Sequence, residues 1–464
     1  MDHLPVMTML AGGTAFCVYA SASYAVLRQV NDVVREPYMD EIFHVPQAQR
    51  YCKRQFDTWD PKLTTPPGLY LISMLPTLAG SSAVCTTAYL RLANWVLGML
   101  LFWATFGILR TLRPQLSASV TAMATLSVSL TPVVFFFHHL YYTDTGSLLF
   151  VLLAYLASLR SRHVLAAVLG FASLWFRQTN VIWVMFIGGS AVLRRIQLSS
   201  GICGAGDSLV GSIAQLARWM VRSGSNSQVR RQLVLLLAPY ACVGTLFAAF
   251  VVVNQGIVLG DKVHHQAVLH VPQMLYFYVY AAGMLAPIVL VLSGPWWFVH
   301  ALRSRSTIAQ CLLACISMGI CVKRYTIEHA FLLSDNRHYP FYVWKNVYRR
   351  HWAAKYLVVP AYVYAIAAIH RCTGTQGTKN PVWRLALVAC TAAVLVPSPL
   401  LEFRYFTIPF VFARLHMSTA TFSVRCLILE TLWCSAINAA TVWMFLNRPF
   451  TWDSEPGKDQ RFMW

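Results

Sequence analysis

Long apolar stretches recur along this chain from residue 7 to residue 447. A helix that crosses a bilayer needs about 20 consecutive apolar residues. Segments that approach this requirement are 7–29, 83–109, 118–137, 146–159, 164–176, 180–193, 233–253, 275–300, 307–322, 353–370, 384–400 and 424–446. We therefore predict an all-α polytopic membrane protein with about 12 transmembrane helices, in which residues 1–464 form a single transmembrane domain.

Composition supports this fold class. Hydrophobic residues make up 57% of the chain and charged residues only 12%, whereas soluble domains carry about 25% charged residues. The net charge of +20 would indicate nucleic-acid binding in a soluble protein. Here the basic residues lie mostly in short strips between apolar runs, as the positive-inside rule describes. We expect no nucleic-acid partner, a cytosolic N-terminus and a flexible, Gly/Ser-rich cytosolic linker at 195–232.

The connections on the opposite side are richer in acidic, aromatic and histidine residues. The connection 323–352 breaks the charge rule, because it carries cations on the predicted lumenal side: Lys323, Arg324, Arg337, Lys345, Arg349 and Arg350. Either the predicted membrane orientation is wrong for this connection, or these cations bind an anionic substrate such as a phosphate.

The first of these connections, the loop 30–66, is unusually acidic. Six of the 17 acidic residues fall between Asp32 and Asp60. The apolar spacing from residue 42 to residue 52 predicts a short amphipathic helix on the membrane surface. Asp40 and Glu41 stand at its start, where helix capping accounts for one carboxylate but not for two. A solvated loop is the alternative, although it leaves the interleaved apolar residues unexplained.

Cysteine and histidine residues give no clear metal signature. The cysteines have no zinc-binding spacing and are interpreted as small core residues, except Cys52 in the polar loop. The pairs His138–His139 and His264–His265 are interpreted as interfacial polar residues rather than as metal ligands. We therefore assign no metal site.

Charges inside the predicted spans bear on a rival function. A transporter would place ionisable residues near the membrane midplane. Arg91 and Glu430 lie within predicted spans, but close enough to an end to reach the interface. The acidic residues cluster in a loop instead, which favours an enzyme, with a polytopic transporter as the alternative from a different class.

Several longer motifs carry a family resemblance. They are YMDEIFHVPQAQRYC (38–52), FDTWDPKLTTPPGLYLIS (56–73), LWFRQTN (174–180), HVPQ (270–273), LLSDNRHYPFYVWK (332–345) and LEFRYFTIPF (401–410). Together they resemble the eukaryotic dolichyl-phosphate-glucose-dependent α-1,2-glucosyltransferases, which complete the lipid-linked oligosaccharide for N-glycosylation. Asp144 departs from the family pattern, in which we expect Glu.

The resemblance implies a GT-C type glycosyltransferase bundle in the endoplasmic reticulum membrane, with a catalytic first lumenal loop. The donor would be dolichyl-phosphate glucose and the acceptor a diglucosylated lipid-linked oligosaccharide, with inversion at the anomeric carbon. No cofactor is expected to be obligatory; a divalent cation held by Asp40 and Glu41 is possible but not favoured. Another dolichyl-phosphate-sugar transferase of the same fold is the nearest alternative.

The resemblance also implies residue roles. Asp40 is the expected general base and Glu41 the alternative base. Candidates to bind sugar hydroxyls or sugar faces are His44, Gln47, Trp59 and Tyr339. Helix packing is the alternative for His44, and interfacial anchoring is the alternative for Trp59 and Tyr339. Candidates around the leaving phosphate are Arg177, Asp335, Arg337, His338, Lys345, Glu402 and Arg404. For Arg404, an ion pair with Glu402 that anchors a helix end is the structural alternative.

Overall fold

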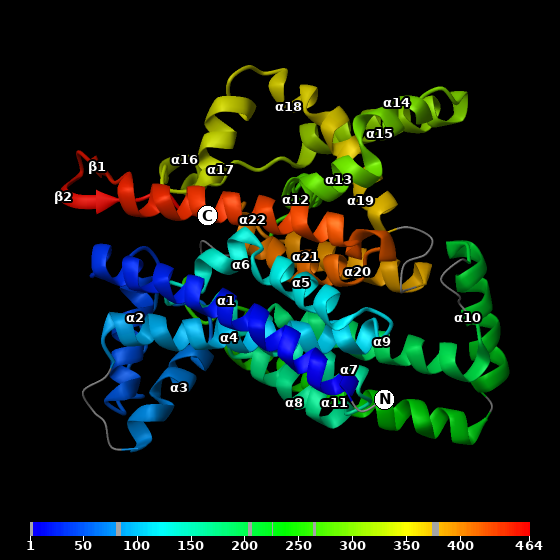
Figure 1. The fold of residues 1–464 in the computed structure, drawn as a ribbon, viewed down its shortest axis with the longest axis horizontal. Coiled ribbons are helices and arrows are strands. Elements are labelled where there is room, and N and C mark those ends of the chain that lie inside the picture. Colours follow the sequence, from blue (N-terminus) through cyan, green and yellow to red (C-terminus); the bar gives the residue numbers. More distant parts are fainter. Residues whose placement is uncertain (1–2, 80–84, 203–206, 225, 263–265, 374–379) are drawn as a thin grey trace. The chain divides into compact units, whose positions relative to one another are not determined.

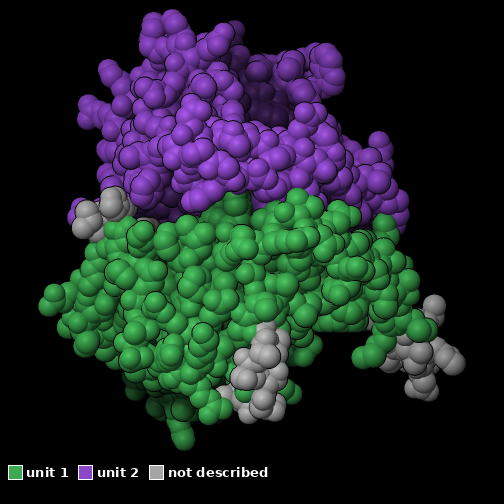
Figure 2. Space-filling model, turned by 90° about the vertical axis from the view of Figure 1, so that its left-hand side faces the viewer, with its two compact units in different colours: residues 1–129, 137–265, 375–390 green, residues 130–136, 266–374, 391–464 purple. Residues whose placement is uncertain are grey.

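The computed structural model describes residues 3–79, 85–202, 207–224, 226–262, 266–373 and 380–464. The chain is almost entirely helical (Figure 1). It divides into two compact units, which Figure 2 shows in separate colours. Unit 1 comprises 1–129, 137–265 and 375–390, and unit 2 comprises 130–136, 266–374 and 391–464.

Unit 1 holds the first polar loop and the helices around it. Within it, α7 packs against α4, α8 and α9, and α1 packs against α4 and α5. Its elements are α1 (His3–Val33), α2 (Glu41–Cys52), α3 (Gly68–Met74), η1 (Leu75–Ala79), α4 (Thr87–Leu112), α5 (Ala118–Ser129), α7 (Thr143–Leu159), α8 (His163–Leu174), α9 (Asn180–Ser200), α10 (Leu209–Gly224) and α11 (Ser227–Asn254).

Unit 2 holds the later motifs. Its elements are α12 (Gln273–Met284), α13 (Ala286–Ser293), α14 (Pro295–Ala301), α15 (Arg305–Tyr325), α16 (Ala330–Ser334), α17 (Tyr339–Val343), η2 (Trp344–Tyr348), α18 (Ala354–Leu357), α19 (Val359–Thr373), η3 (Phe403–Phe406), α21 (Thr407–Leu415), η4 (Thr419–Phe422), α22 (Val424–Asn447), β1 (Phe450–Trp452) and β2 (Glu455–Gln460). The division between units falls within α6 (Pro132–Phe137) and α20 (Pro381–Leu395). The antiparallel pair β1–β2 is a small hairpin after the last helix.

The helices confirm a multi-pass membrane protein. Among the described residues, six are long and apolar enough to cross a membrane: α1, α4, α9, α11, α15 and α22. A seventh span results if α12 and α13, which meet at 86°, form one broken helix. The shorter predicted segments also form helices, such as α7, α8 and α20, but these have only 12 to 17 residues.

Two expectations about charges inside the spans were wrong. Arg91 and Glu430 do not reach toward the interface, because both are completely or almost completely buried. Arg91 pairs with Glu41, and Glu430 pairs with Arg414 of α21 at 2.7 Å. Each buried charge therefore has a buried partner, 50 residues away for Arg91 and 16 residues away for Glu430. Such pairing is the condition for placing charges in an apolar interior.

The segment 195–232 differs from the predicted flexible linker. Where it is described it is mostly helical: α9 continues to Ser200, α10 covers Leu209–Gly224 and α11 begins at Ser227. Along α10 the apolar residues recur at helical spacing among small and polar residues, with Arg218 and Arg222 in its second half. Gly/Ser content alone did not reveal this amphipathic pattern.

Candidate active site

The two neighbouring carboxylates at the start of α2 have different surroundings. Glu41 is completely buried, and its two oxygens face the Nε and Nη2 of Arg91 in α4 at 2.8 and 2.5 Å. The backbone N–H groups of Tyr38 and Tyr141 donate to the same carboxylate at 3.0 and 2.6 Å. Each oxygen of Glu41 thus accepts two hydrogen bonds, and the side chain joins α2 to α4 and to the segment before α7.

Asp40 occupies the N-cap position of α2, but its side chain makes no capping hydrogen bond. The residue is half-buried, and its backbone N–H donates to the hydroxyl of Tyr142 at 3.1 Å. Met39 precedes it with a φ of 55°, a left-handed conformation that costs a non-glycine residue about 1 kcal/mol or more. The backbone around Asp40 is therefore held in a special conformation while its carboxylate is not used to cap the helix.

Helix α2 itself was predicted correctly, but its apolar face is covered by protein. Val45, Ala48 and Tyr51 are buried, and α2 packs against α3. Ile42, by contrast, is 51% exposed. The amphipathic pattern therefore reflects packing on α3 and not only contact with a membrane.

One turn after the carboxylates, His44 and Gln47 both have protein partners. His44 Nδ1 lies 2.6 Å from the hydroxyl of Tyr70. Gln47 donates to the carbonyl of Thr58 at 2.8 Å and accepts the N–H of Asp60 at 3.1 Å. Gln47 thus holds the loop that follows α2, and a role of either residue in sugar binding stays a prediction.

Tyr70 of α3 is the centre of an aromatic cluster beside α2. Its ring centroid lies 5.8 Å from His44, 6.0 Å from Trp59 and 5.5 Å from Tyr51. Trp59 donates its indole N–H to the carbonyl of Leu63 at 3.3 Å. The predicted sugar-facing residues His44 and Trp59 are therefore brought together, with Tyr70 as a member that the sequence analysis did not single out.

The LWFRQTN motif after α8 contacts the first loop directly. The N–H of Gly68 donates to the carbonyl of Trp175 at 2.8 Å, and Gln178 donates to the carbonyl of Thr64 at 2.7 Å. A Cβ atom at Gly68 would lie 2.6 Å from the carbonyl oxygen of Trp175, so this approach requires glycine. In the same motif, Arg177 forms an ion pair with Asp144 at 2.8 Å.

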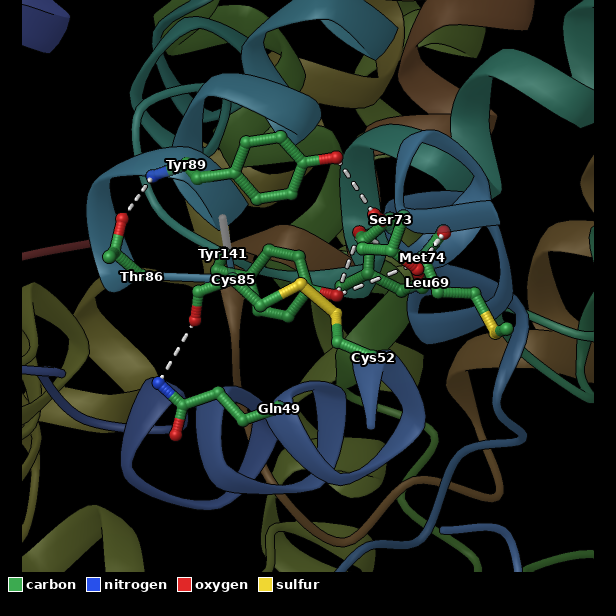
Figure 3. The surroundings of a disulfide bond; sticks show 10 residues. Gln49, Cys52, Leu69, Ser73, Met74, Cys85, Thr86, Tyr89 and Tyr141 are labelled. Carbon is green, nitrogen blue, oxygen red and sulfur yellow. Dashed lines mark hydrogen bonds between the residues drawn. A yellow bond between two sulfur atoms is a disulfide. The ribbon is translucent and has the colours of Figure 1, made fainter. Parts of the chain in front are cut away.

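A disulfide joins Cys52, the last residue of α2, to Cys85, just before α4 (Figure 3). Gln49 of α2 also donates to the carbonyl of Cys85 at 3.1 Å. The interpretation of Cys85 as a core residue at the start of a span was wrong, because α4 begins only at Thr87. Since Arg91 holds the other end of α2, the helix is fastened to the α4 segment at both ends.

In unit 2, the Asp335–Tyr339 motif is organised around Arg337. Its guanidinium forms two hydrogen bonds with Asp335, at 2.8 and 2.7 Å, and a third at 3.0 Å with Gln460. It also lies 4.6 Å from the ring of Trp452 in β1. Burial alone would raise the pKa of Asp335, but the hydrogen bonds and charge of Arg337, together with His338, lower it below its usual value.

The C-terminal segment completes this motif, and nothing in the sequence analysis pointed to it. His338 Nδ1 lies 2.8 Å from the carbonyl oxygen of Trp464. The Trp464 ring contacts Tyr339 at 5.1 Å and Phe403 at 5.8 Å, centroid to centroid. Burial raises the pKa of Tyr339 to about 12. Trp464 therefore contacts both predicted arginine motifs, and its only sequence signal is an aromatic residue in a polar stretch.

The second arginine motif adopts the alternative arrangement considered for it. Arg404 forms an ion pair with Glu402 at the start of η3. Phe403 stacks on Tyr280 of α12 at 5.5 Å, which fixes this turn. A phosphate-binding role of Arg404 is not tested by this arrangement and stays a prediction.

The HVPQ motif fastens the segment before Glu402. His270 donates its backbone N–H to the carbonyl of Val396 at 2.9 Å, and Gln273 donates to the carbonyl of Leu400 at 2.9 Å. Burial lowers the pKa of His270 to about 4, although hydrogen bonds to backbone carbonyls partly oppose the shift.

The remaining histidine candidates have structural contacts where they are described. His138 lies 3.1 Å from the hydroxyl of Tyr19, and His139 lies 3.0 Å from the hydroxyl of Ser23. These contacts fasten α1 to the turn before α7. His264 and His265 lie outside the described residues. Within the described part of the chain, no three His, Cys, Asp or Glu side chains are grouped so that they could hold a metal ion.

The fold and the site define a polytopic membrane protein whose polar motifs lie in connections between helices. A family model described as the DIE2/ALG10 family matches residues 34–415. The chain is 38% identical to the Dol-P-Glc:Glc(2)Man(9)GlcNAc(2)-PP-Dol alpha-1,2-glucosyltransferase of Mus musculus, covering 93% of this chain and 94% of the relative. It is 37% identical to the protein of that name from Homo sapiens over 93% and 94% of the two chains. The relative from Arabidopsis thaliana is 36% identical, over 94% of this chain and 96% of its own.

This chain belongs to the DIE2/ALG10 family. The family match begins just before Asp40 and ends just after the Arg404 motif, so all the motifs that carried the resemblance lie within it. No solved structure matches the chain.

Proposed function

We propose that this protein transfers glucose from dolichyl-phosphate glucose to Glc2Man9GlcNAc2-PP-dolichol and forms an α-1,2 linkage. Family membership carries this conclusion, because relatives that share more than a third of the residues over nearly the whole chain are named for this activity. The donor and acceptor are both lipids, which suits a protein that crosses the membrane several times.

The reaction is a single displacement at the anomeric carbon. The 2-hydroxyl of the acceptor's terminal glucose attacks that carbon, the bond to the phosphate oxygen breaks, and dolichyl phosphate leaves. Inversion converts the β-linked donor to an α-linked product. A general base must take the hydroxyl proton, and cations or hydrogen-bond donors must stabilise the leaving phosphate.

Asp40 is the proposed general base. Its carboxylate is half-buried and does not cap α2, whereas both oxygens of Glu41 already accept hydrogen bonds from Arg91 and backbone N–H groups. With these four donors in place, the carboxylate of Glu41 is engaged in holding α2 to α4 and to the segment before α7. Glu41 is therefore proposed as a positioning residue that fixes the start of α2 so that Asp40 meets the acceptor.

The proposed fold is a GT-C type bundle of about 12 spans, in which the shorter helices α7, α8 and α20 also enter the membrane. The proposed location is the endoplasmic reticulum membrane, with the first loop in the lumen. The Cys52–Cys85 disulfide supports this side, because disulfides persist in oxidising compartments. No cofactor is proposed as obligatory, and the leaving phosphate is assigned to the motifs around Arg337 and Arg404.

Activity of two matched variants tests the assignment. Asp40→Asn is expected to lower kcat by about 10²- to 10⁴-fold, measured as triglucosylated product from dolichyl-phosphate glucose and the diglucosylated acceptor. The KM values should change little, because the amide keeps the size of the carboxylate. Glu41→Gln should lose folded protein, with kcat per folded molecule much less affected. Normal turnover by Asp40→Asn would remove Asp40 from the mechanism.

Linkage analysis separates this function from its alternative. Another dolichyl-phosphate-sugar transferase of the same fold would use a different acceptor or form a different bond. A product that resists an α-1,2-specific glucosidase would favour that alternative.

A further inference from the structure

The chain between α17 and α19 presents a group of exposed cations. Arg349 and Arg350 have no role in the proposed mechanism, and Lys345 beside them was predicted from the sequence to lie near the leaving phosphate. In Figure 1 this is the yellow segment that runs from α17 to α18. Lys345, Arg349 and Arg350 are all exposed. Among the described residues, none of these three forms an ion pair. We call residues 344–351 the basic turn.

The basic turn is held in an unusual backbone conformation. The N–H of Arg349 donates to the carbonyl of Trp344 at 2.9 Å, five residues earlier, so η2 is a turn of π-helix. Trp344 is buried and stacks on Tyr348 with ring centroids 4.5 Å apart and 10° between their planes. The edges of both rings contact Tyr276 of α12. Single π-helical turns occur often at functional sites, and here the stacked rings of buried Trp344 and half-buried Tyr348 fix a turn whose charged side chains remain exposed.

Helix α15 places the basic turn at the end of a membrane span. Leu312, Leu313 and Ile316 are exposed along it, as expected of a helix that faces lipid. The helix ends with Lys323 and Arg324, both exposed, and α18 packs against α15. Basic residues at the end of an apolar span mark the level of the lipid headgroups.

Exposed apolar side chains flank the cations. Trp352 and Leu357 are each 76% exposed, and Val343 and Val347 are also exposed. A cationic surface bordered by exposed apolar groups at this level suits an amphiphile with an anionic headgroup. It does not suit a soluble anion as well, because the apolar border would gain nothing from it.

We propose that the basic turn binds the diphosphate headgroup of the lipid-linked acceptor. This inference rests on the proposed function, because the relatives' acceptor carries a diphosphate between its oligosaccharide and its lipid. The donor phosphate must lie at the reacting carbon, whereas the acceptor's diphosphate and its reacting glucose are at opposite ends of an oligosaccharide. The acceptor headgroup therefore needs a site of its own, and three cations without carboxylate partners match its charge.

The test compares two double variants in reconstituted full-length protein. The test variant is Arg349→Gln with Arg350→Gln, which leaves Lys345 in place. The control is Arg303→Gln with Arg305→Gln, two exposed cations of the same unit that form no ion pair among the described residues. The substrates are the diglucosylated diphosphate-linked acceptor and the same glycan released from its diphosphate lipid.

The test variant is expected to raise KM for the diphosphate-linked acceptor by roughly ten- to a hundredfold, with kcat and the donor KM unchanged. With the released glycan, the test variant and the wild type should have equal rates. The control variant should behave as the wild type with both acceptors. The difference in acceptor KM between the wild type and the test variant should become smaller as the salt concentration rises, because the contact is electrostatic and exposed.

Four outcomes would overturn the proposal. A rise in donor KM alone would assign the turn to the donor phosphate. An equal loss with the control variant, or a loss abolished by removing anionic phospholipid from the bilayer, would indicate general headgroup binding. An unchanged acceptor KM would leave the turn without this ligand.

Direct binding of a short-chain isoprenyl diphosphate keeps this result separate from the proposed function. If the wild type makes no triglucosylated product, the function fails, but the test variant is still expected to bind the isoprenyl diphosphate at least tenfold more weakly. Equal binding by both proteins would overturn the headgroup site on its own.

Discussion

Replacing Glu41 by Gln should destabilise the protein far more than the same replacement at Asp40. The amide of Gln has one acceptor oxygen and an NH2 group, but four donors point at the Glu41 carboxylate: two from Arg91 and one each from the backbone of Tyr38 and Tyr141. At least one donor then faces another donor, and Arg91 stays buried without a counter-charge.

The size of the effect follows from burial. Removing one partner of a buried ion pair costs about 3–5 kcal/mol, a large part of the roughly 5–15 kcal/mol that stabilises a typical folded protein. In thermal unfolding of purified protein, this corresponds to a fall in Tm of roughly 5–15 °C. Asp40→Asn should change Tm by no more than about 1–2 °C, because Asp40 is half-buried and its replacement leaves the buried Glu41–Arg91 pair intact.

A double-mutant cycle makes the test specific. Glu41→Gln combined with Arg91→Gln should cost much less than the sum of the single replacements, because the second change removes the unpaired charge. The protein is assayed in detergent by the temperature at which half of it remains folded. If Glu41→Gln unfolds at the same temperature as the wild type, or if the effects of the two single replacements simply add, the buried pair does not anchor α2.

Three further predictions concern other contacts. Replacing Cys52 or Cys85 by Ser should lower the free energy of unfolding by about 4 kcal/mol, since the bond closes a loop with a sequence separation of 33. Thermal unfolding of the oxidised protein measures the difference between the wild type and the Ser variant. A difference that persists after both proteins have been reduced would contradict the prediction. Trp452→Ala should weaken donor binding about fivefold by removing the ring beside Arg337, and Trp452→Phe should restore most of it in donor KM measurements. The free energy of unfolding should rise with pH between about 4 and 6.5, by up to about 3 kcal/mol, because in this range His270 binds a proton in the unfolded chain but not in the folded one. The free energy of unfolding of His270→Gln should not show this rise.

The sequence predicted the helices better than their roles in the membrane. Apolar runs located all six of the described helices that are long enough to cross a membrane, because a lipid-facing helix must be apolar along its length. They could not separate complete spans from helices such as α7, which has 17 residues and is largely buried in unit 1. The helix α10 was missed because its apolar residues are spread among glycine, serine and arginine, so its hydrophobicity is visible only as a periodicity.

For the site, sequence located the residues but not their pairings. Asp40 and Glu41 stood out by charge, yet nothing local distinguishes the half-exposed carboxylate from the buried one. The difference depends on Arg91, 50 residues later, and on Tyr141, 100 residues later. Similarly, the contact of Arg337 with Gln460 joins residues 123 positions apart. Pairings of this kind depend on tertiary packing, and one sequence carries no signal for them.

The disulfide between Cys52 and Cys85 also has a consequence for biosynthesis. Its two cysteines flank the stretch that contains α3 and η1, so both must emerge from the ribosome and reach an oxidising compartment before the bond can form. A chain whose first loop has been left on the wrong side of the membrane therefore cannot lock α2 in place. With the first loop in the lumen, as proposed, correct insertion of the first span becomes a condition for the disulfide that fastens α2, and a free thiol pair would mark misinserted chains.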